Sequence, residues 1–97
     1  MALKFEWDEK KAKANLKKHG VSFEEAKTVF GDPLARISED STHSQDEQRC
    51  HIIGMSDQYR VIVVAYTEKP DRIRIITARK AEPSERKRYE KIRLNQK

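Results

Sequence analysis

The sequence predicts an α+β fold in which an N-terminal strand and a two-helix hairpin pack on an antiparallel sheet, with a helix at the C-terminus. Apolar residues recur with helical spacing up to about residue 33 and then alternate with polar residues. The turns that separate the later alternating segments are short enough for antiparallel neighbours. No linker interrupts the 97 residues, so we expect a single domain over residues 1–97.

The first elements are a strand and a helix. Residues 3–7 alternate apolar and polar side chains, which is typical of a half-buried strand. Asp8 then provides an N-cap for a helix over residues 9–18, and Gly20 is placed to end that helix in the left-handed conformation. The apolar face that we expect on this helix comprises Ala12, Leu16 and His19.

A second helix follows at once and completes the hairpin. Ser22 and Glu25 have the spacing of a capping box. Residues 31–33, Gly-Asp-Pro, end the helix. Its predicted buried face comprises Phe23, Ala26 and Phe30.

The second half of the chain predicts most of the sheet. A short strand over residues 34–38 precedes a polar, exposed loop over residues 39–48. Three stronger strands are expected over residues 50–56, 60–67 and 72–79. Alternation predicts that Val61, Val63, Ala65, Ile73 and Ile75 pack beneath the hairpin. It places Arg60, Ile62, Val64, Tyr66, Arg72, Arg74, Ile76 and Ala78 on the opposite, open face.

The last helix is predicted from Pro83 to about Leu94. Besides Leu94, only Tyr89 and Ile92 offer apolar surface to a core, whereas cations crowd the segment. We therefore expect weak docking and predict that this helix is the element most easily displaced, with an acidic or amphipathic segment able to bind over it or replace it.

Composition narrows the class of protein. No run of even ten uncharged apolar residues exists, which predicts a cytoplasmic protein with no membrane span and no signal peptide. Lone Cys50 excludes an intrachain disulfide and a multi-cysteine zinc site. The spacing of the other residues shows no phosphate-binding glycine loop, no nucleophile elbow and no paired histidines for zinc, so we expect no cofactor and no metal.

Charge is unevenly distributed along the chain. Residues 1–48 carry 8 Lys and Arg against 10 Asp and Glu, whereas residues 49–97 carry 13 against 6. The planar guanidinium group of arginine presents hydrogen-bond donors that match the oxygens of a phosphate. The cationic second half therefore favours a polyanionic partner such as nucleic acid. A solvated basic surface explains the charge alone equally well, and arginines that only extend along strand ends explain the cationic face.

One reaction needs only cationic and aromatic side chains. RNA is cleaved by its own 2′-hydroxyl when the phosphate is held in line, protons are moved and charge on the phosphorane is stabilised. The candidate phosphate clamps are Arg49, Arg60, Arg74 and Arg79, and the candidate proton carriers are His43, His51, Glu47, Tyr66 and Tyr89. Each has a structural alternative, such as a helix anchor for Tyr89 or a half-buried strand position for His51.

The order of short motifs along the chain is more specific than any one of them. The stretches concerned are Phe5-Glu6-Trp7-Asp8, Asn15, Lys18 to Ala26, Asp32-Pro33, Asp40, His43, Glu47, Arg49, Gly54-Met55-Ser56, Arg60, Tyr66-Thr67-Glu68, Ile73 to Arg79, Glu85-Arg86 and Tyr89. In these stretches, from Phe5 to about Tyr89, the sequence resembles the BrnT family of toxins. Lys69 and Thr77 depart from the family pattern, where Arg and Ser are expected.

The resemblance implies a RelE-like fold and an endoribonuclease toxin of a bacterial type II toxin–antitoxin system, which inhibits translation and growth. It also implies a protein partner, a BrnA-like ribbon-helix-helix antitoxin that neutralises the toxin. DNA contact would be indirect, through the antitoxin.

These inferences combine into one predicted mechanism, which is metal-independent cleavage of RNA by 2′-hydroxyl attack. Arg60 and Arg79 are predicted to clamp the phosphate together, although alternation places them on opposite faces. A bulge near Thr77-Ala78, or departure of the chain from the sheet there, would reconcile them, and otherwise Arg74 is the better second clamp. The assisting catalytic residues are Arg49, His43 and Tyr89, and the predicted RNA-binding residues are Arg74, Arg72, Tyr66 and Arg86. The alternative is a non-catalytic RNA-binding or regulatory module.

Overall fold

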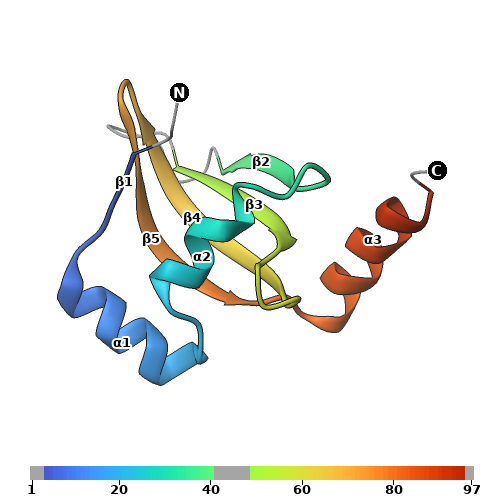
Figure 1. The fold of residues 1–97 in the computed structure, drawn as a ribbon, viewed down its shortest axis with the longest axis horizontal. Helices are drawn as coiled ribbons and strands as arrows, with labels where there is room; N and C mark the ends of the chain where they lie inside the picture. Colours follow the sequence, from blue (N-terminus) through green and yellow to red (C-terminus); the bar gives the residue numbers. More distant parts are fainter. Residues whose placement is uncertain (1–3, 41–48, 96–97) are drawn as a thin grey trace.

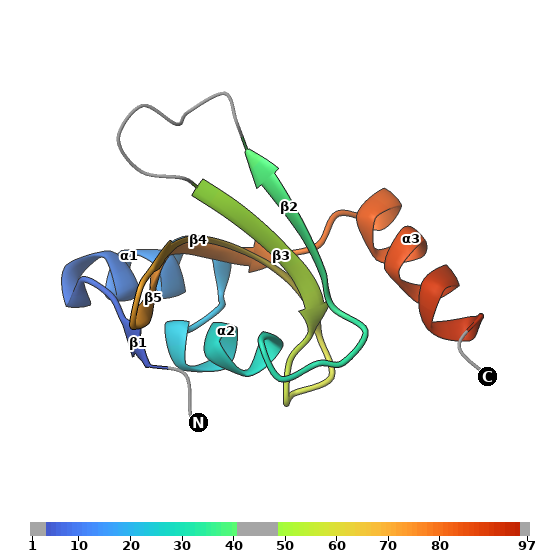
Figure 2. The same cartoon turned by 90° about the horizontal axis from the view of Figure 1, so that it is seen from above.

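The computed structural model describes residues 4–40 and 49–95, and it has the predicted α+β organisation. The elements in chain order are β1 (Phe5–Glu6), α1 (Glu9–His19), α2 (Phe23–Val29), β2 (Arg36–Asp40), β3 (Arg49–Met55), β4 (Val61–Lys69), β5 (Arg72–Lys80) and α3 (Pro83–Leu94). Figures 1 and 2 show α1 and α2 together against one face of a curved sheet, and α3 standing apart beyond the edge at β2.

The sheet is mixed and has the strand order β1-β5-β4-β3-β2. Strands β2 to β5 are antiparallel, as predicted, because short turns join β3 to β4 and β4 to β5. Strand β1 is parallel to β5, which corrects the expectation of a purely antiparallel sheet. Parallel neighbours need a long connection, and here the two helices and strands β2 to β4 lie between β1 and β5 in the sequence.

The helix termini are capped largely as the sequence predicts. The Asp8 side chain accepts hydrogen bonds from the N–H groups of Lys10 and Lys11, and Gly20 ends α1 with a φ of 71°. The Ser22 hydroxyl accepts from the Glu25 N–H at 3.0 Å. The reciprocal half of that capping box is absent, because the Glu25 carboxylate turns toward Arg60 and Ser56 instead.

One prediction about α1 was wrong. Leu16 is 51% exposed, and Asn15 is the buried residue of the helix. The Asn15 amide donates to the carbonyl oxygens of Val21 at 2.9 Å and Ala78 at 2.8 Å, and its own oxygen accepts from the Ala78 N–H. Of the predicted face, Ala12 does pack against the core, so helix α1 is held by this residue and by the hydrogen bonds of Asn15 to β5, not by Leu16.

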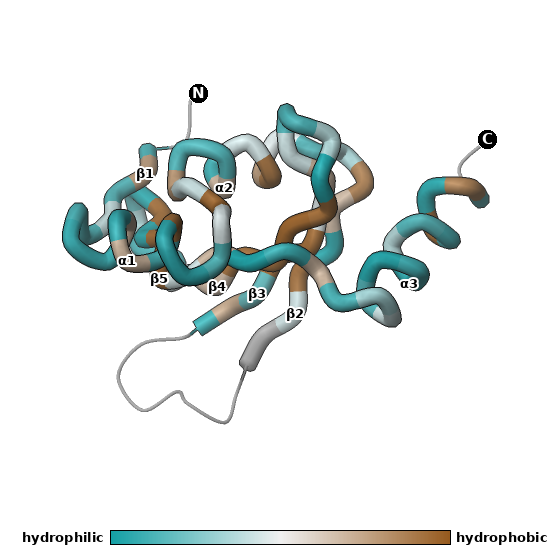
Figure 3. Tube along the Cα trace, turned by 90° about the horizontal axis from the view of Figure 1, so that it is seen from below, coloured by the Kyte–Doolittle hydropathy of each residue, from teal (hydrophilic) through white to brown (hydrophobic). Residues whose placement is uncertain are grey.

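The core lies between α2 and the sheet. Its α2-side residues are Val21, Phe23, Ala26 and Val29, and its sheet residues are Cys50, Ile52, Ile62, Val64, Tyr66, Ile73, Ile75 and Ala78. The most apolar segments lie in β3 to β5, whereas α1 and α3 are largely hydrophilic and α2 is mixed (Figure 3). Phe30 is only partly buried but packs against this core, so the predicted buried face of α2 is confirmed.

The predicted faces of β4 and part of β5 were inverted. Ile62, Val64 and Tyr66 face the helices, and Val61, Val63 and Ala65 face away from them. The register shifts between Ala65 and Tyr66, so that Ala65 pairs with Thr77 while Tyr66 pairs with Ile75, and the skipped residue, Ile76, forms a β-bulge. In β5 simple alternation fails because one extra residue exchanges the two faces for the rest of the strand. In β4 residues 61–67 are apolar or buried on both faces, so alternation does not distinguish the face toward the helices.

Candidate active site

The open face of the sheet carries three cross-strand rows of side chains. The register places Ile53, Val63 and Arg79 in one row, His51, Ala65 and Thr77 in the next, and Arg49, Thr67 and Arg74 in the third. Successive rows are about 7 Å apart because each row is two residues further along β3 and β4. His51 therefore lies between two rows that each contain arginine.

A cleft of about 570 Å³ lies over this face, between β2, the central strands and α3. Its polar side includes Arg36, Ser38, His51, Arg79 and Arg88. Its apolar side includes Ile37, Ile53, Val63 and Ile92. Only small side chains, those of Ala65 and Thr77, follow His51 across the sheet, which leaves space above the centre of the face.

Arg79 is held in the cleft by a bidentate ion pair. Its two terminal nitrogens donate to Oε1 and Oε2 of Glu85 at 2.8 and 3.0 Å. The Arg79 hydrogen bonds lower the pKa of the Glu85 carboxyl to about 2, and the same contact raises the pKa of Arg79. The bulge in β5, one residue before the predicted position, is what turns Arg79 to the open face.

The Glu85 pair makes the attachment of α3 dependent on pH. A carboxyl group whose pKa is about 2 in the folded chain against 4.5 ordinarily stabilises the fold above pH 4.5, and this contribution declines as the pH falls toward 2. Glu85→Gln is therefore expected to be less stable than the wild type at neutral pH, with a difference that narrows on acidification. Urea unfolding of both proteins from neutral pH down to the acid range measures this difference in the free energy of unfolding. A difference that does not change with pH would contradict the assignment of the low pKa to Glu85.

Asp32 fastens α3 from the other side. Its carboxylate is almost completely buried, accepts from the N–H groups of Leu34 at 3.0 Å and Met55 at 2.8 Å, and receives the Tyr89 hydroxyl hydrogen bond. These hydrogen bonds lower the pKa of Asp32 against the opposing effect of burial. Arg93 donates to the Tyr89 hydroxyl oxygen at 3.1 Å. Tyr89 is thus the anchor that the sequence offered as its structural alternative.

Loss of the Tyr89 hydroxyl is expected to loosen α3. Tyr89→Phe removes one donor from a buried carboxylate, which costs about 1–3 kcal/mol. Amides 84–95 should then exchange faster than in the wild type, and amides 61–69 should be unchanged. Hydrogen exchange followed by mass spectrometry measures both segments. Tyr59→Phe is the matched control, because Tyr59 is 85% exposed. Equal protection of 84–95 in both variants would contradict the anchor.

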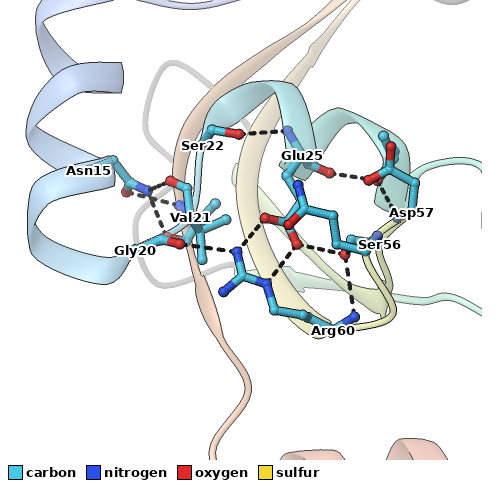
Figure 4. A network of polar contacts seen from close by, with 11 residues as sticks. Asn15, Gly20, Val21, Ser22, Glu25, Ser56, Asp57 and Arg60 are labelled. Atoms are coloured by element: carbon cyan, nitrogen blue, oxygen red, sulfur yellow. Dashed lines mark hydrogen bonds and ion pairs between the residues drawn. The ribbon is translucent and has the colours of Figure 1, made fainter.

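Arg60 does not join Arg79. It precedes β4, and its guanidinium group turns toward the hairpin, where Nε donates to Glu25 Oε2 at 2.9 Å and Nη2 donates to Glu25 Oε1 and to the Gly20 carbonyl oxygen (Figure 4). Figure 4 also shows Ser56, whose hydroxyl donates to the same carboxylate at 2.6 Å. The pKa of Glu25 is lowered, chiefly by the Arg60 hydrogen bonds. The expectation of a joint clamp is corrected: Arg60 bonds to the hairpin, and Arg79 lies in the cleft.

The other predicted residues are distributed over several places. Tyr66 is 3% exposed in the core against Phe30, and burial raises its pKa to about 12, so its side chain is not on the open face where the prediction of RNA binding placed it. Tyr89 is 1% exposed, yet it is among the residues that line the cleft. Arg86 lines a separate hollow with Arg60 and Lys80. His43 and Glu47 lie outside the described residues.

Arg72 and Arg74 lie toward the far end of the open face, where both pair with Glu6 of β1. Their hydrogen bonds and charges lower the pKa of the Glu6 carboxyl, with Arg74 as the main cause. Arg49 lies in the same row as Arg74, separated from it by Thr67. The structure thus brings together Arg49, Arg74 and Arg79 with His51 on one face, and leaves Arg60, Tyr66 and Arg86 elsewhere.

Three contributors to the cleft were absent from the predicted site. Arg36 and Arg88 enter it from β2 and α3, and Glu85 orients Arg79. The signal available for Glu85 was its spacing from Glu82, whose N–H donates to Glu85 Oε1 at 2.8 Å at the start of α3. Within the described residues, no group of three or more His, Cys, Asp and Glu side chains gathers in a way that could hold a metal ion, and no helix is long and apolar enough to cross a membrane.

Comparison with known proteins identifies the family. A family model described as the ribonuclease toxin BrnT of type II toxin–antitoxin systems matches residues 7–85. The crystal structure of the Brucella abortus ribonuclease toxin BrnT is similar in fold, with a TM-score of 0.63 and 23% sequence identity over 84% of this chain and 99% of that chain. No curated protein matches the chain. Because the family model spans most of the sequence, this chain belongs to the BrnT family of ribonuclease toxins of type II toxin–antitoxin systems.

Proposed function

We propose that this toxin cleaves RNA in the cleft over the open sheet face, by attack of the substrate's own 2′-hydroxyl. The observation that carries the proposal is the position of His51, in a row of small side chains between the Arg79 row and the row of Arg49 and Arg74. Two cationic rows about 7 Å either side of a proton carrier suit an extended phosphodiester chain that passes over the histidine.

The reaction needs no metal in this proposal, because the substrate supplies the nucleophile. His51 takes the 2′-hydroxyl proton as the 2′ oxygen attacks the adjacent phosphorus in line, since histidine is the residue type that exchanges protons near neutral pH. Arg79 and Arg49 stabilise the charge that develops on the phosphorane oxygens. The 5′ oxygen leaves with a proton, and the products carry a 2′,3′-cyclic phosphate and a 5′-hydroxyl. The group that donates this proton is proposed to be His43, one of the proton carriers that the sequence predicts.

Removal of Arg79 tests the clamp. Arg79→Ala is expected to reduce the rate of RNA cleavage by about 10²- to 10³-fold, because a preorganised donor to the phosphorane is lost. The assay uses purified protein and single-stranded RNA in EDTA, with end groups analysed on the products. Lys13→Ala is the control, because it removes an exposed cation of α1, away from the cleft.

Four outcomes of this assay would count against the proposal. A near wild-type rate of RNA cleavage by Arg79→Ala would show that Arg79 does not stabilise the phosphorane. Products with 3′-hydroxyl ends, or cleavage abolished by EDTA, would exclude 2′-hydroxyl attack without metal. RNA binding with no cleavage, with or without ribosomes, would favour the non-catalytic alternative.

The finer features of the system are also proposals. We propose that residues 1–97 act as one RelE-like domain in the cytoplasm, that a BrnA-like ribbon-helix-helix antitoxin neutralises it, and that DNA is contacted only through that antitoxin. The support is the sequence resemblance together with membership of a type II toxin–antitoxin family, which implies a protein antitoxin.

A further inference from the structure

The turn between β3 and β4 holds a tyrosine in an unusual backbone conformation. Tyr59 has a φ of 63°, and among the described residues it is the only one other than glycine in the left-handed region. Two backbone hydrogen bonds fix the turn: the Tyr59 N–H donates to the Ser56 carbonyl oxygen at 3.0 Å, and the Ser56 N–H donates to the Arg60 carbonyl oxygen at 2.8 Å. Three-residue hairpin loops favour glycine at this position, because a larger side chain is strained there. The turn alone therefore gives no reason for a tyrosine, and such strained positions cluster at functional sites.

The ring of Tyr59 is presented to solvent beside a cationic hollow. Tyr59 is 85% exposed, and it lines a hollow of about 420 Å³ together with Arg60, Lys80, Arg86 and the carboxylate of Glu90. The Arg60 guanidinium group is already bonded to the hairpin. Lys80 and Arg86 are exposed, and neither forms an ion pair with another residue that the structure describes. An exposed aromatic ring beside available cations is the arrangement that binds a single-stranded nucleic acid, through base stacking and phosphate contacts.

The hollow lies next to the cleft. At the end of β5, Arg79 lines the cleft and the following residue, Lys80, lines the hollow. Helix α3 contributes to both, with Arg88 in the cleft and Arg86 in the hollow. The two binding surfaces therefore lie on either side of the first turns of α3, and an extended strand that leaves the cleft reaches the hollow past the start of this helix.

We infer that the hollow is a second binding site for the single-stranded RNA substrate, in which a nucleobase stacks on Tyr59 and the adjoining phosphates bind Lys80 and Arg86. Stacking accepts every base and the cations contact only the backbone, so this site adds affinity without reading sequence. A duplex does not fit, because its bases are not free to stack on the ring. The inference rests on the proposed function in placing the cleaved bond in the cleft, whereas binding in the hollow requires no cleavage.

Binding of an RNA that cannot be cleaved tests this inference. The probe is a short single-stranded oligoribonucleotide with 2′-O-methyl groups, which lacks the attacking hydroxyl, and fluorescence anisotropy measures its affinity for the full chain. Tyr59→Gly is expected to bind at least about fivefold more weakly, because the stacking surface is lost. The urea midpoint of this variant should not fall, since glycine relieves the left-handed strain. Tyr59→Phe keeps the ring and should bind like the wild type.

The two cations are tested through the salt dependence of binding. The double variant Lys80→Ala with Arg86→Ala is expected to bind more weakly. The slope of log affinity against log salt concentration should become shallower by about 1.4, which corresponds to two lost phosphate contacts. Lys13→Ala removes an exposed cation of α1 and should keep the wild-type slope.

The outcomes separate this inference from the proposed function. Wild-type affinity of Tyr59→Gly, an equal loss for Tyr59→Phe, or an unchanged salt slope in the double variant would each overturn the second site. Binding of polyglutamate with the same dependence on Tyr59 would assign the hollow to a protein partner instead. RNA cleavage at saturating enzyme concentration tests the proposed function separately, and Tyr59→Gly should keep the wild-type rate there. A chain that binds the probe through Tyr59 but cleaves no RNA keeps the second site and loses the proposed function, and the reverse result does the opposite.

Discussion

Replacement of His51 by alanine is expected to reduce the rate of RNA cleavage by about 10²- to 10⁴-fold, the largest effect on activity predicted for this chain. The reason is its position: Ser38, Ala65 and Thr77 lie in its row, and the arginine rows lie on either side. His51 is only half-buried, so the loss of its side chain should leave the fold intact. Single-turnover cleavage of RNA measures the effect, and urea unfolding verifies the fold.

The matched control for this variant is His19→Ala. His19 is also half-buried, but it lies at the end of α1, where a cation is favourable for the helix dipole. We expect a small loss of stability and wild-type cleavage. If both histidine variants cleave RNA at the same rate, His51 is not the proton carrier. The predicted carrier is then His43.

Replacement of Arg60 by alanine is expected to affect stability most. The side chain of Glu25 is 2% exposed and accepts hydrogen bonds from Arg60 and Ser56. Removing one partner leaves a buried charge uncompensated, which costs about 3–5 kcal/mol. Denaturant unfolding measures the loss. Cleavage per folded molecule should stay near that of the wild type, because Arg60 does not line the cleft.

A second substitution separates charge from packing at this pair. Glu25→Gln in the Arg60→Ala background removes the unpaired charge, so the double variant is expected to be more stable than Arg60→Ala alone. The opposite pattern, in which Arg60→Ala keeps full stability and loses cleavage, would restore the catalytic role that the sequence predicted for Arg60.

The local elements were predictable because short-range rules govern them. The Asp8 cap, the left-handed Gly20 and the start of α3 at Pro83 lie where the sequence placed them. Strands β3 to β5 begin and end within two residues of their predicted bounds. Propensity, capping and alternation act over a few residues, so a window of sequence contains the information.

The composition of the site was less predictable. Arg60, Arg79 and Tyr89 are equally plausible in the sequence, but only the fold separates them. Arg79 lines the cleft, where it pairs with nearby Glu85. Arg60 is turned away from the cleft to the buried carboxylate of Glu25, and the hydroxyl of Tyr89, although Tyr89 lines the cleft, is bonded to the buried carboxylate of Asp32. Those carboxylates lie 35 and 57 residues away in sequence. The spacing of residues in the sequence does not reveal partners that are so far apart along the chain.

The sequence by itself determined the class of fold, the bounds of the elements, the cationic second half and the resemblance to a toxin family. Tertiary structure decided that Arg79 lies on the open face, whereas Arg60 is bonded to the hairpin. The deciding feature is the single extra residue at the Ile76 bulge, which moves Arg79 from the face of Ile73 and Ile75 to the open face. A strand has a period of two, so one residue reverses every side chain beyond it, and a bulge is selected by cross-strand packing rather than by local sequence.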